Sequence, residues 1–241
     1  MVAHREDLRR SPRPLKLRFV SAGAAQGLVS AVAAERRVQI AGSFGAVGAM
    51  LEKLDAGEPA DIVILTRPQI ERLEKESRIV RASASDLGLV PTSIAVRIHD
   101  AAPDVGSEAG LRGALLAADT IHFPDPSRAT AGIHFAKVLE KLGLDQALKA
   151  RLRTHPNGAT AMRALAGTSG RPIGCTQATE ILATPGVRLV GPLPRGFELD
   201  TVYTAAVHAQ ATDREAAGAF VRALTGGEAR ERRANAGFGP A

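Results

Sequence analysis

Short apolar runs alternate with amphipathic stretches along most of the chain, and this alternation limits the possible folds more than any other feature. In the first part, the apolar runs 15–22, 38–41 and 61–65 predict strands, and the amphipathic stretches 24–36 and 46–56 predict helices. Strands that alternate with helices indicate a parallel sheet covered by helices on both faces. Only 3% of the 241 residues are aromatic, so we expect a core of Ala, Val, Leu and Ile, which suits such a sheet.

A second alternating set follows a polar loop at residues 100–108. Its predicted strands are residues 120–123, 152–154, 173–176 and 187–190, and its predicted helices are residues 111–118, 132–142 and 159–166. Further strands are predicted at 90–97 and 201–208, and helices at 213–224 and 228–236. The chain therefore contains two α/β units, and from these patterns its last part can return to either one.

The charge distribution disfavours nucleic acid as a partner. The formal net charge is +6, but the basic residues are scattered and the densest runs lie near the two ends, where solvated charge is common. Residues 1–14 are expected to be a disordered tail. No apolar run is long enough to insert in a membrane and no signal peptide is present, so we expect a cytoplasmic protein as the chain stands, or a periplasmic one if a signal has been removed.

Four predicted strand-to-helix junctions are rich in Ser, Thr, Gly and Ala. They are residues 21–24, 42–46, 125–132 and 156–160. At the N-terminus of a helix, free backbone N–H groups and the helix dipole favour an anion. Ser and Thr are also ordinary N-cap residues, which is the structural alternative for any single junction. Because there are four junctions, we expect Ser21, Ser43, Thr130 and Thr160 to face one anion-binding cleft.

Motifs for catalysis and metal binding are scarce. The six His residues lack metal-ligand spacing, Cys175 lies in a predicted buried strand, and no phosphate loop or nucleophile motif is found, so no metal and no cofactor is expected. Arg67 and Arg128 are either surface residues or a clamp for a carboxylate. His134, close to the third junction, is likewise either a surface residue or part of the cleft.

Several segments together resemble the molybdate-binding-protein-like family of bacterial substrate-binding proteins. These segments are residues 43–49, 57–65, 125–126 with 131–136, 174–177 with 180–182, 191–194 and 201–203, and the resemblance extends over about residues 16–225. The resemblance implies a type 2 periplasmic-binding-protein fold, in which two mainly parallel or mixed sheets flanked by helices form two lobes joined by two crossover strands. Lobe 1 would comprise residues 15–90 plus 205–241, lobe 2 residues 91–204, and the crossovers would lie near 90–97 and 198–208.

In this family, backbone N–H groups and hydroxyls hold a compact oxyanion such as molybdate between the lobes. Carried over to this sequence, together with the junctions and the two arginines, the resemblance indicates a ligand-binding set. The set is Ser21, Ala22, Ser43, Phe44, Arg67, Arg128, Thr130, Ala131, Ala159, Thr160 and Gln177. Because Arg67, Arg128 and His134 suit a carboxylate, the anion is either an oxyanion or a carboxylate.

Three functions are compatible with these observations. The first is a solute-binding protein that closes on a small anion and, as the family implies, serves the membrane component of an ABC transporter. The second is a cofactor-independent isomerase of an unsaturated polycarboxylate, because the family also contains aconitate isomerase; His134 and Arg128 are then the catalytic candidates. The third is a regulator that uses the fold as a sensor, and the lack of a helix-turn-helix signature before residue 15 disfavours it.

Overall fold

The computed structural model describes residues 14–241, so the expected tail at residues 1–14 lies outside the described residues except for Pro14, which is exposed. The strands are β1 (Lys16–Ala22), β2 (Gln39–Gly45), β3 (Ile62–Thr66), β4 (Ser85–Arg97), β5 (Thr120–Pro124), β6 (Leu152–His155), β7 (Pro172–Gln177), β8 (Val187–Pro192) and β9 (Asp200–Val207). The helices are α1 (Gln26–Arg36), α2 (Val47–Asp55), α3 (Arg67–Lys75), α4 (Glu108–Ala117), α5 (Thr130–Lys141), α6 (Gly158–Gly167), α7 (Ala178–Leu182), α8 (Arg214–Thr225) and α9 (Arg230–Asn235). Short 3₁₀ turns occur at η1 (Gly23–Ala25), η2 (Lys149–Arg151) and η3 (Gly227–Ala229).

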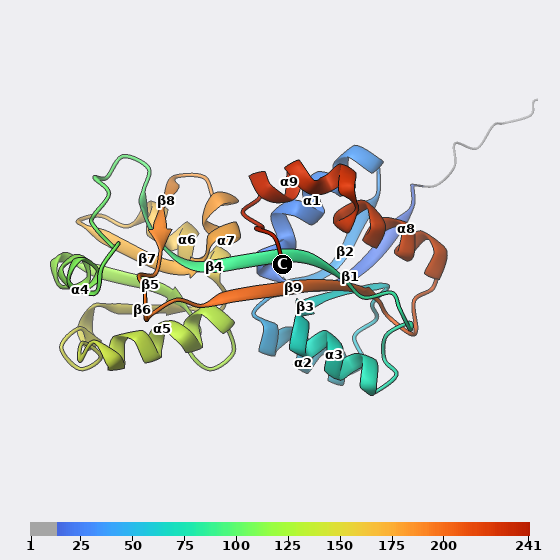
Figure 1. Cartoon of the computed structure of the whole chain (residues 1–241), viewed down its shortest axis with the longest axis horizontal. Coiled ribbons are helices and arrows are strands. Elements are labelled where there is room, and N and C mark those ends of the chain that lie inside the picture. Colours follow the sequence, from blue (N-terminus) through green and yellow to red (C-terminus); the bar gives the residue numbers. More distant parts are fainter. Residues whose placement is uncertain (1–13) are drawn as a thin grey trace, which may run out of the picture.

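Two long strands, β4 and β9, connect the two halves of the molecule, and they run side by side through its middle (Figure 1). The strand order is β2-β1-β3-β9-β4-β7-β5-β6, with β8 also paired to β4. Residues 85–91 of β4 pair with β9, and residues 92–95 pair with β7 in the other half. Pro91, the last residue before this change of partner, has no N–H to donate to a ladder. This α/β arrangement with two crossovers is the fold class expected from the sequence.

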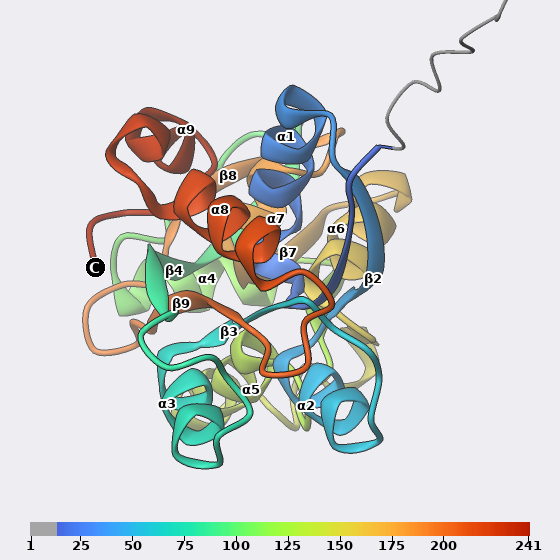
Figure 2. The ribbon, with the colours of Figure 1, turned by 90° about the vertical axis from the view of Figure 1, so that its right-hand side faces the viewer.

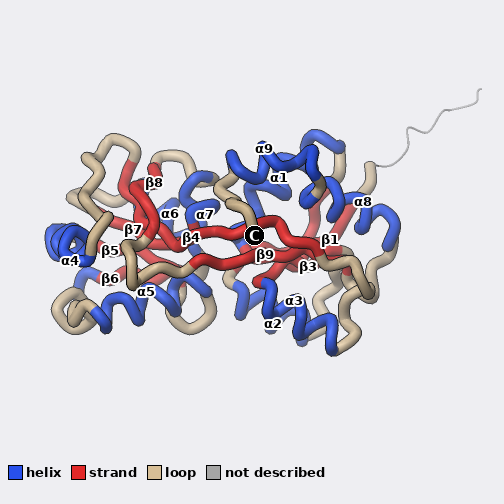
Figure 3. Tube along the Cα trace, in the orientation of Figure 1, coloured by secondary structure: helices blue, strands red, loops and turns tan. Residues whose placement is uncertain are grey.

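Helices cover both faces of each sheet, as the strand–helix alternation predicts. In the first half, α1, α8 and α9 lie on one side of β1–β3, and α2 and α3 lie on the other (Figure 2). In the second half, α6 and α7 lie on the opposite side of the strands from α5 (Figure 3). No helix within residues 14–241 is long and apolar enough to cross a membrane.

The halves have separate hydrophobic cores. One core contains Leu17, Phe19, Leu65 and Phe220, so α8 packs on the N-terminal half of the chain. The other contains Ile94, Leu111, Phe135 and Cys175. The terminal segment also returns to the hinge, because the backbones of Leu89 and Gly239 exchange two hydrogen bonds of 2.8 and 3.0 Å. These contacts are compatible with the expected lobes, 15–90 plus 205–241 and 91–204, although their exact bounds stay a prediction.

Two helices were not expected from the sequence. Helix α3 follows β3 directly and has Pro68 in its first turn. Helix α7 has only five residues, and four of them are buried, so it offers no amphipathic pattern to detect. This second omission matters for function, because α7 carries a carboxyl group, that of Glu180, into the space between the halves.

A buried carboxylate joins three segments of the first half. Asp61 is 3% exposed and accepts hydrogen bonds from the backbone N–H of Arg18 at 2.9 Å, from its guanidinium at 2.7 and 3.0 Å, and from the backbone N–H of Thr212 at 2.9 Å. Burial alone would raise the pKa of Asp61, but the bonds from Arg18 and Thr212 outweigh it and lower the pKa to about 2. The ionised form therefore stabilises the contact between β1, β3 and the segment after β9.

We predict that Asp61→Asn lowers the free energy of unfolding by about 2 kcal/mol at neutral pH, because the folded-state pKa lies below the unfolded value of about 3.9. Because the pKa of Asp61 is lower in the folded state, its stabilisation is fully present above the pKa of the unfolded state. That stabilisation is lost as the pH falls from about 4 to about 2. The difference between the two proteins in urea unfolding should therefore shrink over that range. Asp55→Asn is the control, because Asp55 is half exposed and, within residues 14–241, is paired with Arg78 alone. An Asp61→Asn effect that does not change with pH would contradict this assignment.

Candidate functional site

The four Ser/Thr/Gly/Ala junctions meet at one small cavity between the two halves. The first half contributes residues 22–24 and 45–47, and the second contributes residues 124, 129–131, 157, 158, 177 and 180. Tyr203 of the crossover strand β9 completes the lining. The cavity volume is about 20 Å³, close to the space of a single water molecule. The space left between the halves in this structure is therefore little larger than a water molecule.

At the four junctions, three of the helical N-termini have no side-chain cap. The N-cap residues of η1, α2 and α5 are Ala22, Ala46 and Ala129, and none of them has a hydroxyl or carbonyl side chain to accept an N–H. The fourth helix, α6, is capped by Asn157, whose side chain accepts the N–H of Thr160 at 2.9 Å. Uncapped N-termini leave backbone donors for water or a ligand. The alternative explanation, that these junctions are merely well-capped helix starts, therefore does not fit three of them.

A buried carboxylate, Glu180 of α7, lies in the wall of the cavity. It accepts a hydrogen bond of 2.6 Å from the Thr176 hydroxyl, and the N–H groups of Gly158, Ala159 and Gln177 also face it. Burial raises the pKa of Glu180 above its ordinary value, although these donors partly oppose the shift. Glu180 is thus a titratable group enclosed at the meeting point of both halves.

Two glycines, one from each half, make room for this carboxylate. A Cβ on Gly158 would lie 1.8 Å from Glu180 Oε2, and a Cβ on Gly23 would lie 2.7 Å from Oε1. Both glycines sit at helical N-termini, Gly23 in η1 and Gly158 in α6. The carboxylate therefore occupies a space that both junctions leave open, close to the backbone of each.

Tyr203, Thr130 and Gln177 are the other polar side chains that connect the cavity to the hinge. The Tyr203 side chain hydrogen-bonds with Thr130, and burial together with the nearby charge of Glu180 raises the pKa of the tyrosine. Gln177 donates through Nε2 to Thr201 at 3.4 Å, and its Oε1 is buried without a protein partner. Among these three side chains, Gln177 Oε1 is the polar atom without a hydrogen-bond partner in the described part of the chain.

No Lys, Arg or His lines this cavity among the described residues. Glu180 is its one carboxylate, and only dipoles and N–H groups offset that charge. At an effective dielectric constant of about 20, a second unit negative charge about 4 Å away would be repelled by about 4 kcal/mol. The charge state of Glu180 therefore decides how well the cavity accepts an anion.

The basic residues instead line a larger groove of about 700 Å³ beside the cavity, which shares Val47 and Thr130 with it. Arg67, Arg128, His134 and Lys137 all contribute to this groove. The first three are engaged: Arg67 pairs with Asp86, Arg128 Nε lies 3.3 Å from Glu52 Oε1, and His134 Nε2 lies 2.7 Å from the Phe197 carbonyl oxygen.

Arg128 links the two halves rather than lining the cavity. Its carbonyl accepts the Gly48 N–H at 3.0 Å, and its guanidinium pairs with Glu52, so both contacts reach helix α2. From the sequence, Arg128 was either a surface residue or a clamp for a carboxylate, and in the structure its side chain is half exposed. It is positioned to hold the halves together in the closed form.

Several other residues that the sequence analysis placed in the binding cleft have side chains bonded or packed elsewhere. Ser43 Oγ donates to Glu58 at 2.7 Å and accepts from Lys53 at 2.8 Å, away from the cavity. Ser21 is buried in β1 and donates to the Ala22 carbonyl at 3.0 Å, and Thr160 Oγ1 donates to Asn157. Phe44 stacks on Phe19. Of the four residues whose hydroxyls were expected in one cleft, Thr130 is the one that lines the cavity. Of the other residues expected to bind the ligand, Ala22, Ala131 and Gln177 also line it, and the N–H of Ala159 faces Glu180.

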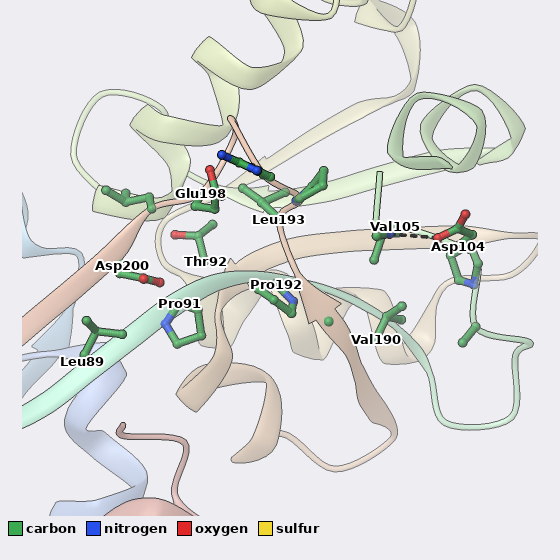
Figure 4. Close-up of a pocket in the computed structure, with 17 residues that line it drawn as sticks. Leu89, Pro91, Thr92, Asp104, Val105, Val190, Pro192, Leu193, Glu198 and Asp200 are labelled. Atoms are coloured by element: carbon green, nitrogen blue, oxygen red, sulfur yellow. Dashed lines mark hydrogen bonds between the residues drawn. The ribbon is translucent and has the colours of Figure 1, made fainter. Parts of the chain in front are cut away.

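A third space lies along the hinge strands (Figure 4). Its volume is about 770 Å³, and its lining is mostly apolar, with Leu89 and Pro91 of β4 and Val190 and Pro192 of β8. Its charged residues are Asp104, Glu198, Asp200 and Arg195, so carboxylates dominate. Among the described residues no uncapped helix start lines it, and together with its carboxylates this makes it a poor place for an anion.

Comparison with known proteins now decides the family. The sequence profile of the bacterial extracellular solute-binding proteins matches residues 17–239. The chain belongs to this family.

Among solved structures, the periplasmic molybdate-binding protein of Azotobacter vinelandii has a TM-score of 0.73 at 18% identity, covering 93% of this chain and 99% of that one. The sulfate-binding protein of Mycobacterium tuberculosis has a TM-score of 0.68 at 21% identity, covering 94% and 87%. An aconitate isomerase from a Pseudomonas species is 25% identical over 193 residues, which is 80% of this chain and 72% of that protein.

The sequence of this solute-binding protein did not reveal Glu180, Tyr203 or the two glycines as site residues. A usable signal was nevertheless present, because Thr176 near the end of the buried strand β7 is followed four residues later by Glu180 in α7. A carboxylate that follows the carboxyl end of a sheet strand is well placed to reach an interlobe cleft.

We predict that Gly158→Ala destabilises this solute-binding protein by about 1–3 kcal/mol, because the new methyl group displaces Glu180 and Thr176. In a double-mutant cycle with Glu180→Ala, thermal or urea unfolding should give a coupling energy of about 1 kcal/mol or more. Gly167→Ala in the same helix is the control, because no atom lies within 4 Å of the position that its methyl group would take, and it should be neutral or slightly stabilising. Additive effects of Gly158→Ala and Glu180→Ala would show that the carboxylate does not occupy this space.

Proposed function

We propose that this protein binds a compact anion, an oxyanion or the carboxylate group of an organic acid, in the cavity between its lobes. The observation that carries the proposal is the convergence of three uncapped helical N-termini, from η1, α2 and α5, on one enclosed space. Such N-termini attract anions through free N–H groups and the helix dipole. Molybdate and sulfate, the ligands named for two solved structures of the same fold, are anions of this kind.

Binding would follow a hinge motion about β4 and β9. The closed cavity holds little more than a water molecule, so the ligand enters while the lobes are apart and is enclosed as they close. The Gly48–Arg128 hydrogen bond and the Arg128–Glu52 ion pair then form across the cleft. In its family context, the closed form would deliver the anion to the membrane component of an ABC transporter outside the cytoplasmic membrane.

We predict that Thr130→Val weakens binding of the preferred anion by about 5- to 30-fold, which corresponds to the loss of one hydrogen bond of about 1–2 kcal/mol. Ser43→Ala is the matched control, and it should leave the affinity unchanged because its hydroxyl is bonded to Glu58 and Lys53. A thermal-shift screen of molybdate, tungstate, sulfate, phosphate, citrate and both aconitates selects the anion, and calorimetry measures the affinities. Equal weakening by both variants, or by Ser43→Ala alone, would contradict this placement of the site.

A second candidate is an isomerase of an unsaturated polycarboxylate, and the enclosed carboxylate of Glu180 favours it. In this function, Glu180 would remove a proton from a carbon next to a substrate carboxylate, the double bond would shift, and the proton would return at another carbon. The uncapped N-termini would stabilise the developing charge, and the basic groove would hold the remaining carboxylates.

Incubation with cis-aconitate, followed by chromatography for the trans isomer, tests this second candidate. The expected result for an isomerase is conversion by the parent protein and its loss in Glu180→Gln. His134 and Arg128, the candidates from the sequence, line the neighbouring groove, so their replacement should raise KM more than it lowers kcat. Absence of conversion by the parent protein would leave anion binding as the function.

A further inference from the structure

The buried carboxyl group of Glu180 lies in the cavity in which an anion is proposed to bind. An anion in the cavity would lie close to a carboxylate that is itself enclosed, and no basic side chain among the described residues lines the space to neutralise either charge. Two like charges at one buried site cannot both stay ionised without a large cost, so such pairs commonly hold a proton between them.

We infer that the cleft binds its anion together with one proton, which lies between the Glu180 carboxylate and the ligand. The inference rests on the proposed function and deepens it, because it names the class of ligand. An anion that carries its own proton, such as hydrogen phosphate or a singly protonated dicarboxylic acid, meets the requirement directly. A fully deprotonated dianion such as sulfate or molybdate binds only if Glu180 takes a proton from solvent.

The geometry supports this role for Glu180 in particular. Gly23 and Gly158 leave space for its two oxygens at helical N-termini of both lobes, so the carboxylate lies where these junctions approach each other. Oε2 is held by Thr176 at 2.6 Å, and Oε1 is the oxygen that faces Gly23 and the other lobe. The side chain is therefore fixed in place with one oxygen directed toward the lobe that closes over the ligand.

No neighbouring charge within the described part of the chain offers an alternative place for the proton. The polar groups that face Glu180 are the hydroxyl of Thr176 and the N–H groups of Gly158, Ala159 and Gln177, and no charged side chain of α1, α6, β4 or β8 affects its pKa. Tyr203 is the one other titratable residue in the cavity lining, and its raised pKa keeps it protonated. Burial favours the protonated form of Glu180 and supports the same conclusion.

The test is calorimetric titration with sulfate, which stays a dianion between about pH 6 and pH 8.5. Titration at one pH in buffers of different ionisation enthalpy measures the protons taken up on binding. We expect about one proton per sulfate at the upper end of this range, and an affinity that falls about tenfold per pH unit above the pKa of Glu180. Hydrogen phosphate should bind with less proton uptake and should be preferred at the higher pH.

Glu180→Gln supplies a permanent N–H donor in place of the proton. This variant should bind sulfate without proton uptake and with an affinity that no longer depends on pH, whereas Tyr203→Phe should retain the uptake. Circular dichroism establishes that each variant is folded, and the pH dependence of the parent protein tests the inference without any variant.

The outcomes separate this inference from the proposed function. Sulfate binding by the parent protein without proton uptake and without pH dependence would overturn the inference alone. Undiminished uptake in folded Glu180→Gln would also overturn it, because another group would hold the proton. Absence of anion binding by both proteins at every pH would overturn the proposed function, and the inference with it.

Discussion

The first backbone N–H groups of a helix have no partner within the helix, and the interlobe site of this protein is built on that constraint. A capping side chain satisfies one of these groups in α4, α6 and α8, but the alanines before η1, α2 and α5 cannot do so. In α2, one of these groups, the Gly48 N–H, is bonded instead to the Arg128 carbonyl. The crossovers β4 and β9 place these helix starts, which belong to different lobes, around the same cavity. The small residues at the junctions then allow a ligand to approach the backbone itself.

The chain has a net charge of +6, but the described basic side chains do not line the cavity in which an anion is proposed to bind. The basic side chains near the cleft are in the adjacent groove and are largely paired, whereas the cavity contains a single carboxylate and no cation among the described residues. Under the proposed function, recognition of an anion would therefore depend on backbone dipoles and on the protonation state of Glu180, and not on a salt bridge with the ligand. Arg128, at the edge of the cleft, contacts Gly48 and Glu52 of α2 across it.

The sequence predicted the architecture well because the architecture depends on periodic patterns. Strand and helix alternation located all nine strands of the described residues, and each of the four junctions contributes to the lining of one cavity. Side-chain direction was harder, because it depends on register and on local partners: Ser43 lies beside Lys53 and Glu58, and Thr160 is bonded to Asn157. Glu180 was missed because α7 is too short to show a helical period, and because a buried acid is recognised only from the groups that surround it.

Anomalous diffraction from crystals grown with tungstate at mildly acidic pH, where Glu180 is more readily protonated, tests the central claim most directly. Tungstate is a compact oxyanion whose heavy atom marks its position unambiguously. The account predicts one strong peak between the lobes, surrounded by the N-termini of η1, α2 and α5 and adjacent to Glu180. A peak among Arg67, Arg128 and Lys137 in the neighbouring groove, with the interlobe cavity free of tungsten, would contradict it.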